Sequence, residues 1–147
     1  MAINLKQNAD MSGGLAGTDG DDGAFVVVTL PWSAITNTSG AFLTVSGPVM
    51  QRRMIVKAIQ YVNDTAATNA VTATIKKAPS ATALGSGTTL HASTANLQAT
   101  AATPVTMTLS TTASDLDIAA GSRIGFVISA TPGAAGVGSF TVTLAPA

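Results

Sequence analysis

Phe140-Thr141-Val142-Thr143-Leu144, close to the C-terminus, places a large apolar residue at every second position and a threonine at each position between. Successive side chains of a β-strand point to opposite faces, so this pattern gives one apolar face and one face of threonines. Threonine suits an exposed face because its branched Cβ favours strands while its hydroxyl stays in water. The stretch therefore predicts a strand that is buried on one face.

The same period of two recurs in Val71–Lys76 and Val105–Ser110, and no segment has a sustained period of 3.6 residues. More apolar stretches are expected to be central strands, or strands covered on both faces by a partner: Phe25–Leu30, Met54–Val62 and Ile124–Ser129. Two weaker strand candidates are Phe42–Val45 and Leu84–His91. Residues that favour turns separate these segments, for example Asn63-Asp64 and Pro132-Gly133.

Short strands separated by turns, without long helices, are typical of an antiparallel sandwich. We therefore predict an all-β chain, a jelly-roll-like antiparallel β-sandwich of about eight strands between Ala24 and Leu144. With 147 residues the chain fits one such domain, residues 24–147. Thr111–Leu116 is expected to form one short 3₁₀ turn, capped by Ser114 or Asp115.

Residues 1–23 differ in composition from the rest of the chain, with five glycines and three aspartates between Met11 and Gly23. Glycine loses much backbone entropy on folding and aspartate favours water, so this segment is predicted to be a flexible or extended N-terminal arm. We expect the arm to be mobile in the isolated protein and ordered on a neighbouring subunit. Its apolar anchors would be Ile3, Leu5, Met11 and Leu15.

The chain is poor in side chains that carry chemistry: it has 7 acidic and 7 basic residues, one histidine, no cysteine and no glutamate. Zero net charge and scattered basic residues argue against nucleic-acid binding, which requires clustered cations. Neither disulfides nor thiolate metal sites can form without cysteine. No apolar run suits a membrane helix or a signal peptide. We therefore expect no cofactor, no membrane or nucleic-acid partner, and synthesis in the cytosol.

Three groups of residues partly match catalytic or metal sites. Asp19–Gly23 is similar to a calcium loop, but no glutamate is present to close an EF-hand. Asp115 and Asp117 form a carboxylate pair, for which a capped turn is the favoured role. His91 is the single histidine, and no serine lies in a Gly-x-Ser-x-Gly motif. We predict no catalytic, cofactor-binding or metal site; a small hydrolase built on His91 with Asp115 or Asp117 is the enzyme alternative.

Trp32 and Tyr61 lie near strand ends, and both are predicted to anchor an interface because aromatic rings bury a large area at modest entropic cost. If both rings were exposed in a cleft, they would instead favour a second function. That alternative is a receptor-binding or carbohydrate-binding module.

Arg53–Val62 followed by Ala70–Pro79, together with Leu109–Gly125, resembles small virion proteins of tailed phages. The resemblance is to capsid decoration, or cement, proteins with jelly-roll-like domains, and it covers roughly Phe25 to Pro146. It implies a non-enzymatic virion structural protein on the capsid exterior, made in the host cytoplasm. Such a protein decorates and stabilises an icosahedral phage capsid by bridging subunits of the major capsid protein. The receptor-binding or carbohydrate-binding alternative would be a β-sandwich module of a phage fibre or tail.

Low charge and apolar strands also predict a homo-oligomer, with a trimer favoured and a dimer as the alternative. Candidates for polar contacts with acidic groups of the capsid or the arm are Arg52, Arg53, Lys57, Lys76 and Lys77, and the alternative is that these bases form a solvated face. The residues predicted to lie at a subunit or capsid interface are Ile3, Leu5, Met11, Leu15, Trp32, Arg52, Arg53, Lys57 and Tyr61.

Overall fold

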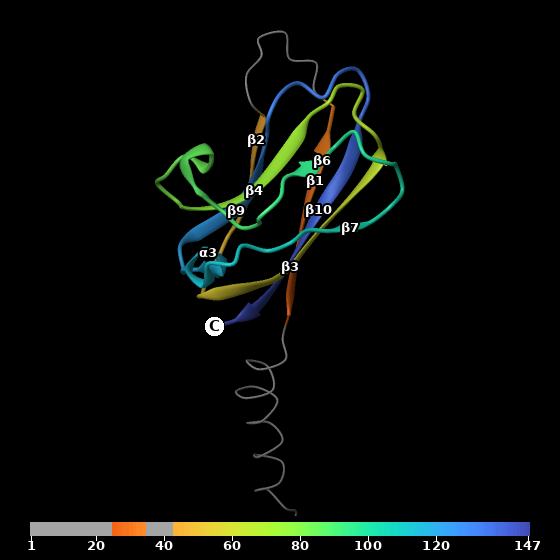
Figure 1. Ribbon diagram of the computed structural model, residues 1–147. Helices are drawn as coiled ribbons and strands as arrows, with labels where there is room; N and C mark the ends of the chain where they lie inside the picture. The colour runs from red at the N-terminus through yellow and green to blue at the C-terminus, as the bar shows by residue number, and fades with distance from the viewer. Residues whose placement is uncertain (1–24, 35–42) are drawn as a thin grey trace, which may run out of the picture.

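Two antiparallel sheets pack face to face over residues 25–34 and 43–147, the residues that the computed structural model describes (Figure 1). The strands are β1 Val26–Ser33, β2 Leu43–Val49, β3 Met54–Thr65, β4 Thr72–Pro79, β5 Thr88–Thr89, β6 Ala95–Asn96, β7 Val105–Thr106, β8 Asp117–Ile118, β9 Ser122–Ile128 and β10 Val137–Pro146. Two short helices interrupt them, η2 Leu84–Ser86 and α3 Ala113–Leu116. No helix in the described part is long and apolar enough to cross a membrane.

The strands pair as a long hairpin that is folded over on itself. β1 pairs with β10, β2 with β9, β3 with β7 and β8, and β4 with β5 and β6. One sheet has the order β1-β10-β3-β7 and the other β2-β9-β4-β5, with β8 and β6 beside β3 and β4. This nested order is that of a jelly roll, so the predicted fold class is confirmed. The strands number ten because two strand positions are each divided into two short pieces.

The core lies where the central strands of the two sheets face each other. The rings of Phe140 in β10 and Phe126 in β9 meet with their centroids 4.8 Å apart, and the ring centroid of Tyr61 in β3 lies 6.3 Å from that of Phe140. Phe140, Val142 and Leu144 are all fully buried, as their period of two predicts. Burial of each such side chain stabilises the fold by roughly 1.5–3 kcal/mol.

The segment Val105–Ser110 keeps the predicted alternation of side chains but does not form one continuous strand. Only Val105–Thr106 pairs with β3, and the Met107 N–H still donates to the Ile59 carbonyl. Leu109 then bridges to His91, beside the other sheet. The prediction of one continuous strand was wrong because the segment changes partners from one sheet to the other and so closes one side of the sandwich.

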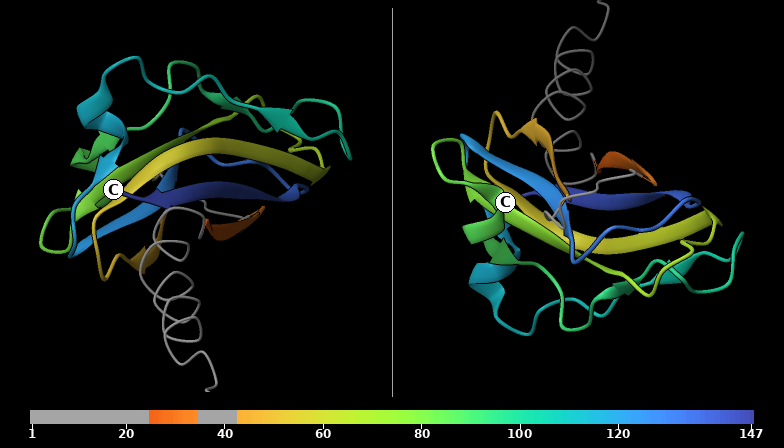
Figure 2. Two further views of the ribbon diagram at one scale, coloured as in Figure 1. Left: turned by 90° about the horizontal axis from the view of Figure 1, so that it is seen from below. Right: turned by 90° about the horizontal axis from the view of Figure 1, so that it is seen from above.

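Phe25–Leu30 was predicted to be central, but β1 is an edge strand that pairs only with β10 among the described residues. Its side chains alternate between exposed and buried from Val27 to Ser33. Figure 2 shows β1 and β2 on one side of the long strands β3 and β10, with β6, β7 and α3 on the opposite side. A partner that covers the outer face of β1 stays a prediction.

Two further predictions on local structure differ from what is observed. In place of the 3₁₀ turn predicted at Thr111–Leu116, Ala113–Leu116 form the four-residue helix α3. Ser114 and Asp115 lie inside this helix and do not cap it; the N-cap position is Thr112, which makes no side-chain cap bond. Leu84–His91 contains η2 and the two-residue β5 in place of a long strand. The arm anchors Ile3, Leu5, Met11 and Leu15, the loop Asp19–Gly23 and Phe42 lie outside the described residues.

His91 is a buried polar residue of the core. Its Nε2 accepts a hydrogen bond of 2.9 Å from the Ile75 N–H, which ties the His91 segment to β4. Acceptance at Nε2 requires the neutral ring with its proton on Nδ1. Nδ1 is buried and has no hydrogen-bond partner of ordinary geometry. Burial lowers the pKa of His91, and the Ser93 backbone offsets this in part.

Trp32 packs against a glycine pair that leads into β10. Its side chain is 3% exposed, and a Cβ on Gly136 would lie 2.9 Å from the ring. A Cβ on Gly138 would lie 2.6 Å from Trp32 Nε1 and 2.2 Å from the Val62 carbonyl oxygen. Gly136-Val137-Gly138 therefore makes room for the indole and for the close approach of β3.

We predict that Gly138→Ala lowers the free energy of unfolding by about 1–3 kcal/mol, because its methyl group overlaps a backbone carbonyl that cannot move aside. Urea unfolding at neutral pH measures this. Gly85→Ala is the matched control, since a Cβ there meets nothing within 4 Å. Equal stability of the two variants would contradict the packing described around Trp32.

Acidification is predicted to destabilise the fold through His91. The unfolded chain binds this proton near the ordinary pKa of 6.5 and the folded chain binds it only at lower pH. The free energy of unfolding is therefore highest above pH 6.5 and falls as pH drops through 6.5 toward the folded pKa, by at most about 1.4 kcal/mol per pH unit. Urea midpoints between pH 7.5 and 5 test this, with His91→Gln as the control that keeps an acceptor but does not titrate.

A pH-independent wild type, or a His91→Gln variant with the same pH dependence, would contradict this prediction. Because His91 is the single histidine of the chain, no other histidine contributes to the pH dependence.

Candidate interaction surface

The residues that were considered for catalysis lie in separate environments. Asp115 Oδ2 accepts a bond of 2.6 Å from the Ser110 hydroxyl, and Asp117 pairs with Arg53. The Nε2 of His91 faces the Ile75 backbone and neither carboxylate. Within residues 25–34 and 43–147 no cluster of three or more His, Asp or Glu side chains could hold a metal ion. The hydrolase alternative therefore lacks the hydrogen bonds it requires.

Arg53 holds Asp117 through a two-pronged contact at the start of β3. Nε donates to Oδ1 at 2.8 Å and Nη2 to Oδ2 at 2.6 Å, and β3 pairs with β8 directly beside this contact, with Ile55 opposite Asp117. The hydrogen bond from Arg53 lowers the pKa of Asp117, and Asp117 raises the pKa of Arg53. Arg53, which was predicted to lie at an interface, is thus part of the subunit's own framework, and its interface role stays a prediction.

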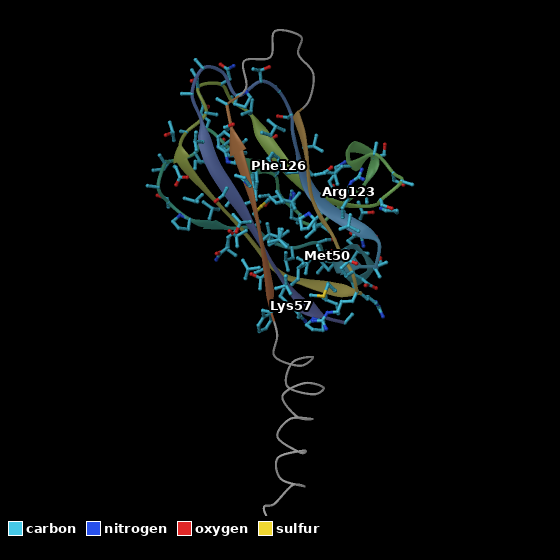
Figure 3. All side chains as sticks on the ribbon, turned by 180° about the vertical axis from the view of Figure 1, so that it is seen from behind. Met50, Lys57, Arg123 and Phe126 are labelled. Atoms are coloured by element: carbon cyan, nitrogen blue, oxygen red, sulfur yellow. The ribbon has the colours of Figure 1, made fainter. Side chains whose placement is uncertain are left out.

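Three other basic side chains fasten connecting segments to the sheets. Lys76 Nζ donates to the Gly85 carbonyl at 2.6 Å, and Lys77 Nζ donates to the carbonyls of Ser114 and Asp117. Arg123 donates to the carbonyls of Ser80 and Thr82, and Figure 3 shows it beside the loop that carries η2. A hollow of about 310 Å³ adjoins these groups. Its cation and its carboxylate, Lys77 and Asp117, are already bonded within the protein.

Trp32 and Tyr61, predicted as interface anchors, lie in the core at 3% and 7% exposure. Tyr61 packs toward Phe140, and Trp32 fills the space beside Gly136 and Gly138. Neither ring is presented in a surface cleft, which is the condition that the carbohydrate-binding alternative needs. Their place at an interface stays a prediction that their burial does not support.

The outer edge of β1 carries backbone groups that pair with no other strand of residues 25–34 and 43–147. β1 and β10 keep one register from Val26↔Leu144 to Ser33↔Val137, and the Ala34 N–H continues it by donating to the Gly136 carbonyl at 2.6 Å. Antiparallel ladders bond at every second residue. Even-numbered residues of β1 therefore face β10, and Val27 and Thr29 direct their N–H and C=O groups away from the sheet.

Pro31 divides this edge. It is odd-numbered, so it stands where its missing N–H costs no bond to β10. A strand that added to β1 would find donors and acceptors at Phe25–Thr29 and then meet the proline. Edge strands with such open groups are sites where another chain can add by β-pairing.

Apolar side chains surround this open edge. Phe25, Val26 and Val27 are 60%, 40% and 59% exposed, and Val49 at the end of β2 is 43% exposed. Large aliphatic and aromatic groups at this exposure, gathered on one edge, mark a contact surface for another protein or for another part of the chain.

A groove of about 260 Å³ opens between the start of β1 and the end of β2. It is lined by Val26, Val28, Pro48, Val49, Met50, Gln51, Arg52 and Met54. Met50 and Lys57 lie toward the same end of the sandwich in Figure 3. We name the edge Phe25–Thr29 together with this groove the β1 surface.

The β1 surface can bind an extended apolar segment, and it has no group suited to acid–base or nucleophilic chemistry. Phe25–Leu30 was expected to be a central strand or a strand covered on both faces by a partner, and its open backbone edge was not predicted. Pro31 was the available signal, because a proline inside a strand pattern indicates an edge.

No protein-family model matches the sequence, and no curated protein matches it. Among solved structures, the chain is similar to infectious bursal disease virus VP2 in a subviral particle, with 18% identity, 83% of this chain and 33% of that chain covered, and a TM-score of 0.40. Structures of the Gx and Gt strains of the same virus give 18% and 20% identity, coverage of 82% and 83% of this chain and 32% and 33% of theirs, and TM-scores of 0.40 and 0.38. The chain thus spans about a third of the length of these chains.

Proposed function

We propose that this chain is a non-enzymatic structural protein of a phage particle, which decorates and stabilises an icosahedral capsid by bridging major capsid subunits from the exterior. The observation that carries the proposal is the β1 surface, an open strand edge with exposed Phe25, Val26 and Val27. A surface of this kind serves contact between protein chains.

The distribution of polar groups supports the same function. The cations of Arg53, Lys76, Lys77 and Arg123 bond to groups of the chain itself and stiffen the sandwich. A rigid module with few mobile charged groups loses little entropy when it is clamped between other proteins. The sequence resemblance to decoration proteins points to a capsid as the object that is clamped.

A homo-oligomer would give such a module its strength on a shell. Once one copy of a linked assembly has bound, the other copies meet their sites at an effective concentration far above the concentration of the free protein. A trimer is the favoured assembly and a dimer the alternative. In either case the shell would be held by avidity in place of one tight contact.

Binding to shells tests the proposal. Empty shells assembled from the major capsid protein encoded in the same genome are mixed with the full chain, with Val27→Asp, and with a shortened chain that starts at Ala24. We expect the full chain to bind and Val27→Asp to bind at least tenfold more weakly, because a carboxylate on the exposed apolar edge must be desolvated. Co-sedimentation measures the bound fraction.

Thr65→Asp is the matched control, since Thr65 is exposed at the opposite end of β3. Loss of binding by the shortened chain, with its sandwich still folded by circular dichroism, supports the arm as a latch. Equal binding of both lengths removes the arm from the mechanism. No binding by any form would contradict decoration itself.

A further inference from the structure

The β1 surface has room for a short strand with one apolar face. Outward-facing backbone groups run over Phe25–Thr29, and Pro31 ends the run. The groove lies beside the first half of β1, where Val26 and Val28 contribute to its lining. A strand added here would run beside these five residues, hydrogen-bond to the outward-facing groups of Phe25, Val27 and Thr29, and place alternate side chains over the groove.

One segment outside the described residues has the matching pattern. Ala2-Ile3-Asn4-Leu5-Lys6 alternates apolar residues with polar ones, and its length equals that of the open edge. Ile3 and Leu5 would share one face of a strand, with Asn4 and Lys6 on the other. Met11 and Leu15 stand among glycines and small residues and do not continue this period.

The length of the chain that precedes β1 also fits. Between Lys6 and Phe25 lie 18 residues, which include five glycines and four aspartates. A fully extended 24-residue segment spans roughly 80 Å at about 3.3 Å per residue. Strand β3, with 12 residues, is only about 40 Å long. The segment is therefore long enough to reach beyond the sandwich from which it starts.

Charge is complementary between the connecting residues and the end of the sandwich where the groove opens. Asp10, Asp19, Asp21 and Asp22 give the stretch after Lys6 its negative charge. Arg52 lines the groove, and exposed Lys57 lies on β3 at the same end (Figure 3). Opposite charges of this kind steer the approach of the segment and favour the docked state at low salt.

We propose that Ala2–Lys6 of a second copy of this chain adds as a strand to the open edge of β1, with Ile3 and Leu5 directed to the groove. The inference rests on the proposed function only in treating the β1 surface as a contact between protein chains. It names the occupant of that surface and makes the oligomer one of exchanged arms. Each docked arm covers exposed Val26 and Val49, which line the groove of its neighbour.

Cysteine cross-linking tests the inference directly, because the natural chain has no cysteine. Leu5→Cys in one chain and Val49→Cys in another chain of different tagged length are mixed and oxidised, both free at high concentration and on shells. We expect a disulfide-linked pair of unlike chains on a non-reducing gel. The pair Leu5→Cys and Thr65→Cys is the control, with Thr65 at the far end of β3, and is expected to give at least tenfold less product.

Substitutions in the arm leave the sandwich unchanged and distinguish specific docking from cross-linking by chance collision. Adding Ile3→Asp to the Leu5→Cys chain is expected to lower the yield at least tenfold, whereas Asn4→Asp adds the same charge on the opposite strand face and is expected to leave it nearly unchanged. Equal effects of the two changes would overturn the strand geometry.

Two further outcomes overturn the assignment to a neighbour. A chain carrying both Leu5→Cys and Val49→Cys that cross-links only within itself would show that the arm covers its own edge. No product above the Thr65→Cys control, free or on shells, would remove the arm from the β1 surface. Either result is separable from the proposed function, because shell binding of the full chain is measured independently by co-sedimentation.

Discussion

The structure depends on the position of β10 between β1 and β3. β10 pairs with β3 along its whole length and with β1 from Val137 to Leu144, so the last strand joins β1 and β3 into one sheet. Phe140, at the centre of β10, meets Phe126 of the opposite sheet and thereby joins the two layers. Since the pairing is nested, placing β10 also fixes β9 against β2 and leaves β1 as an edge. The contact surface is thus a consequence of the strand order.

Polar groups of the described residues largely support this frame. His91 ties its segment to β4, Lys77 holds α3 and β8, and Arg123 holds the turn after β4. Each of these bonds gives a hydrogen-bond partner to a backbone N–H or C=O group that would otherwise need water. Cations that are used in this way are poor candidates for recognising a distant acidic partner. The β1 surface, by contrast, presents exposed apolar side chains and a backbone edge.

Period-two patterning was sufficient to predict the fold, because strands buried on one face must alternate. Phe140–Leu144 shows this most clearly, with all three apolar residues buried. The pattern could not predict that Val105–Ser110 changes sheets, since side-chain alternation says nothing about which strand supplies the hydrogen bonds. It also could not decide between a central and a partner-covered Phe25–Leu30, because a strand that is apolar on both faces has the same pattern whether its second face is covered by its own chain or by another chain. The candidate surface was missed for that reason. The packing of Trp32 on Gly136 and Gly138 joins residues far apart in the sequence, and no local pattern predicts it.

Hydrogen–deuterium exchange at single amides of β1 tests most directly whether the β1 surface is where this chain meets another protein. In dilute free protein the account predicts slow exchange at Val28 and Leu30, which bond to β10, and fast exchange at Val27 and Thr29, which face outward. On assembled shells the amides of Val27 and Thr29 are predicted to become slow as well, while the exposed connection around Ser80 is unchanged. Fast exchange at Val27 and Thr29 on fully decorated shells would contradict the account.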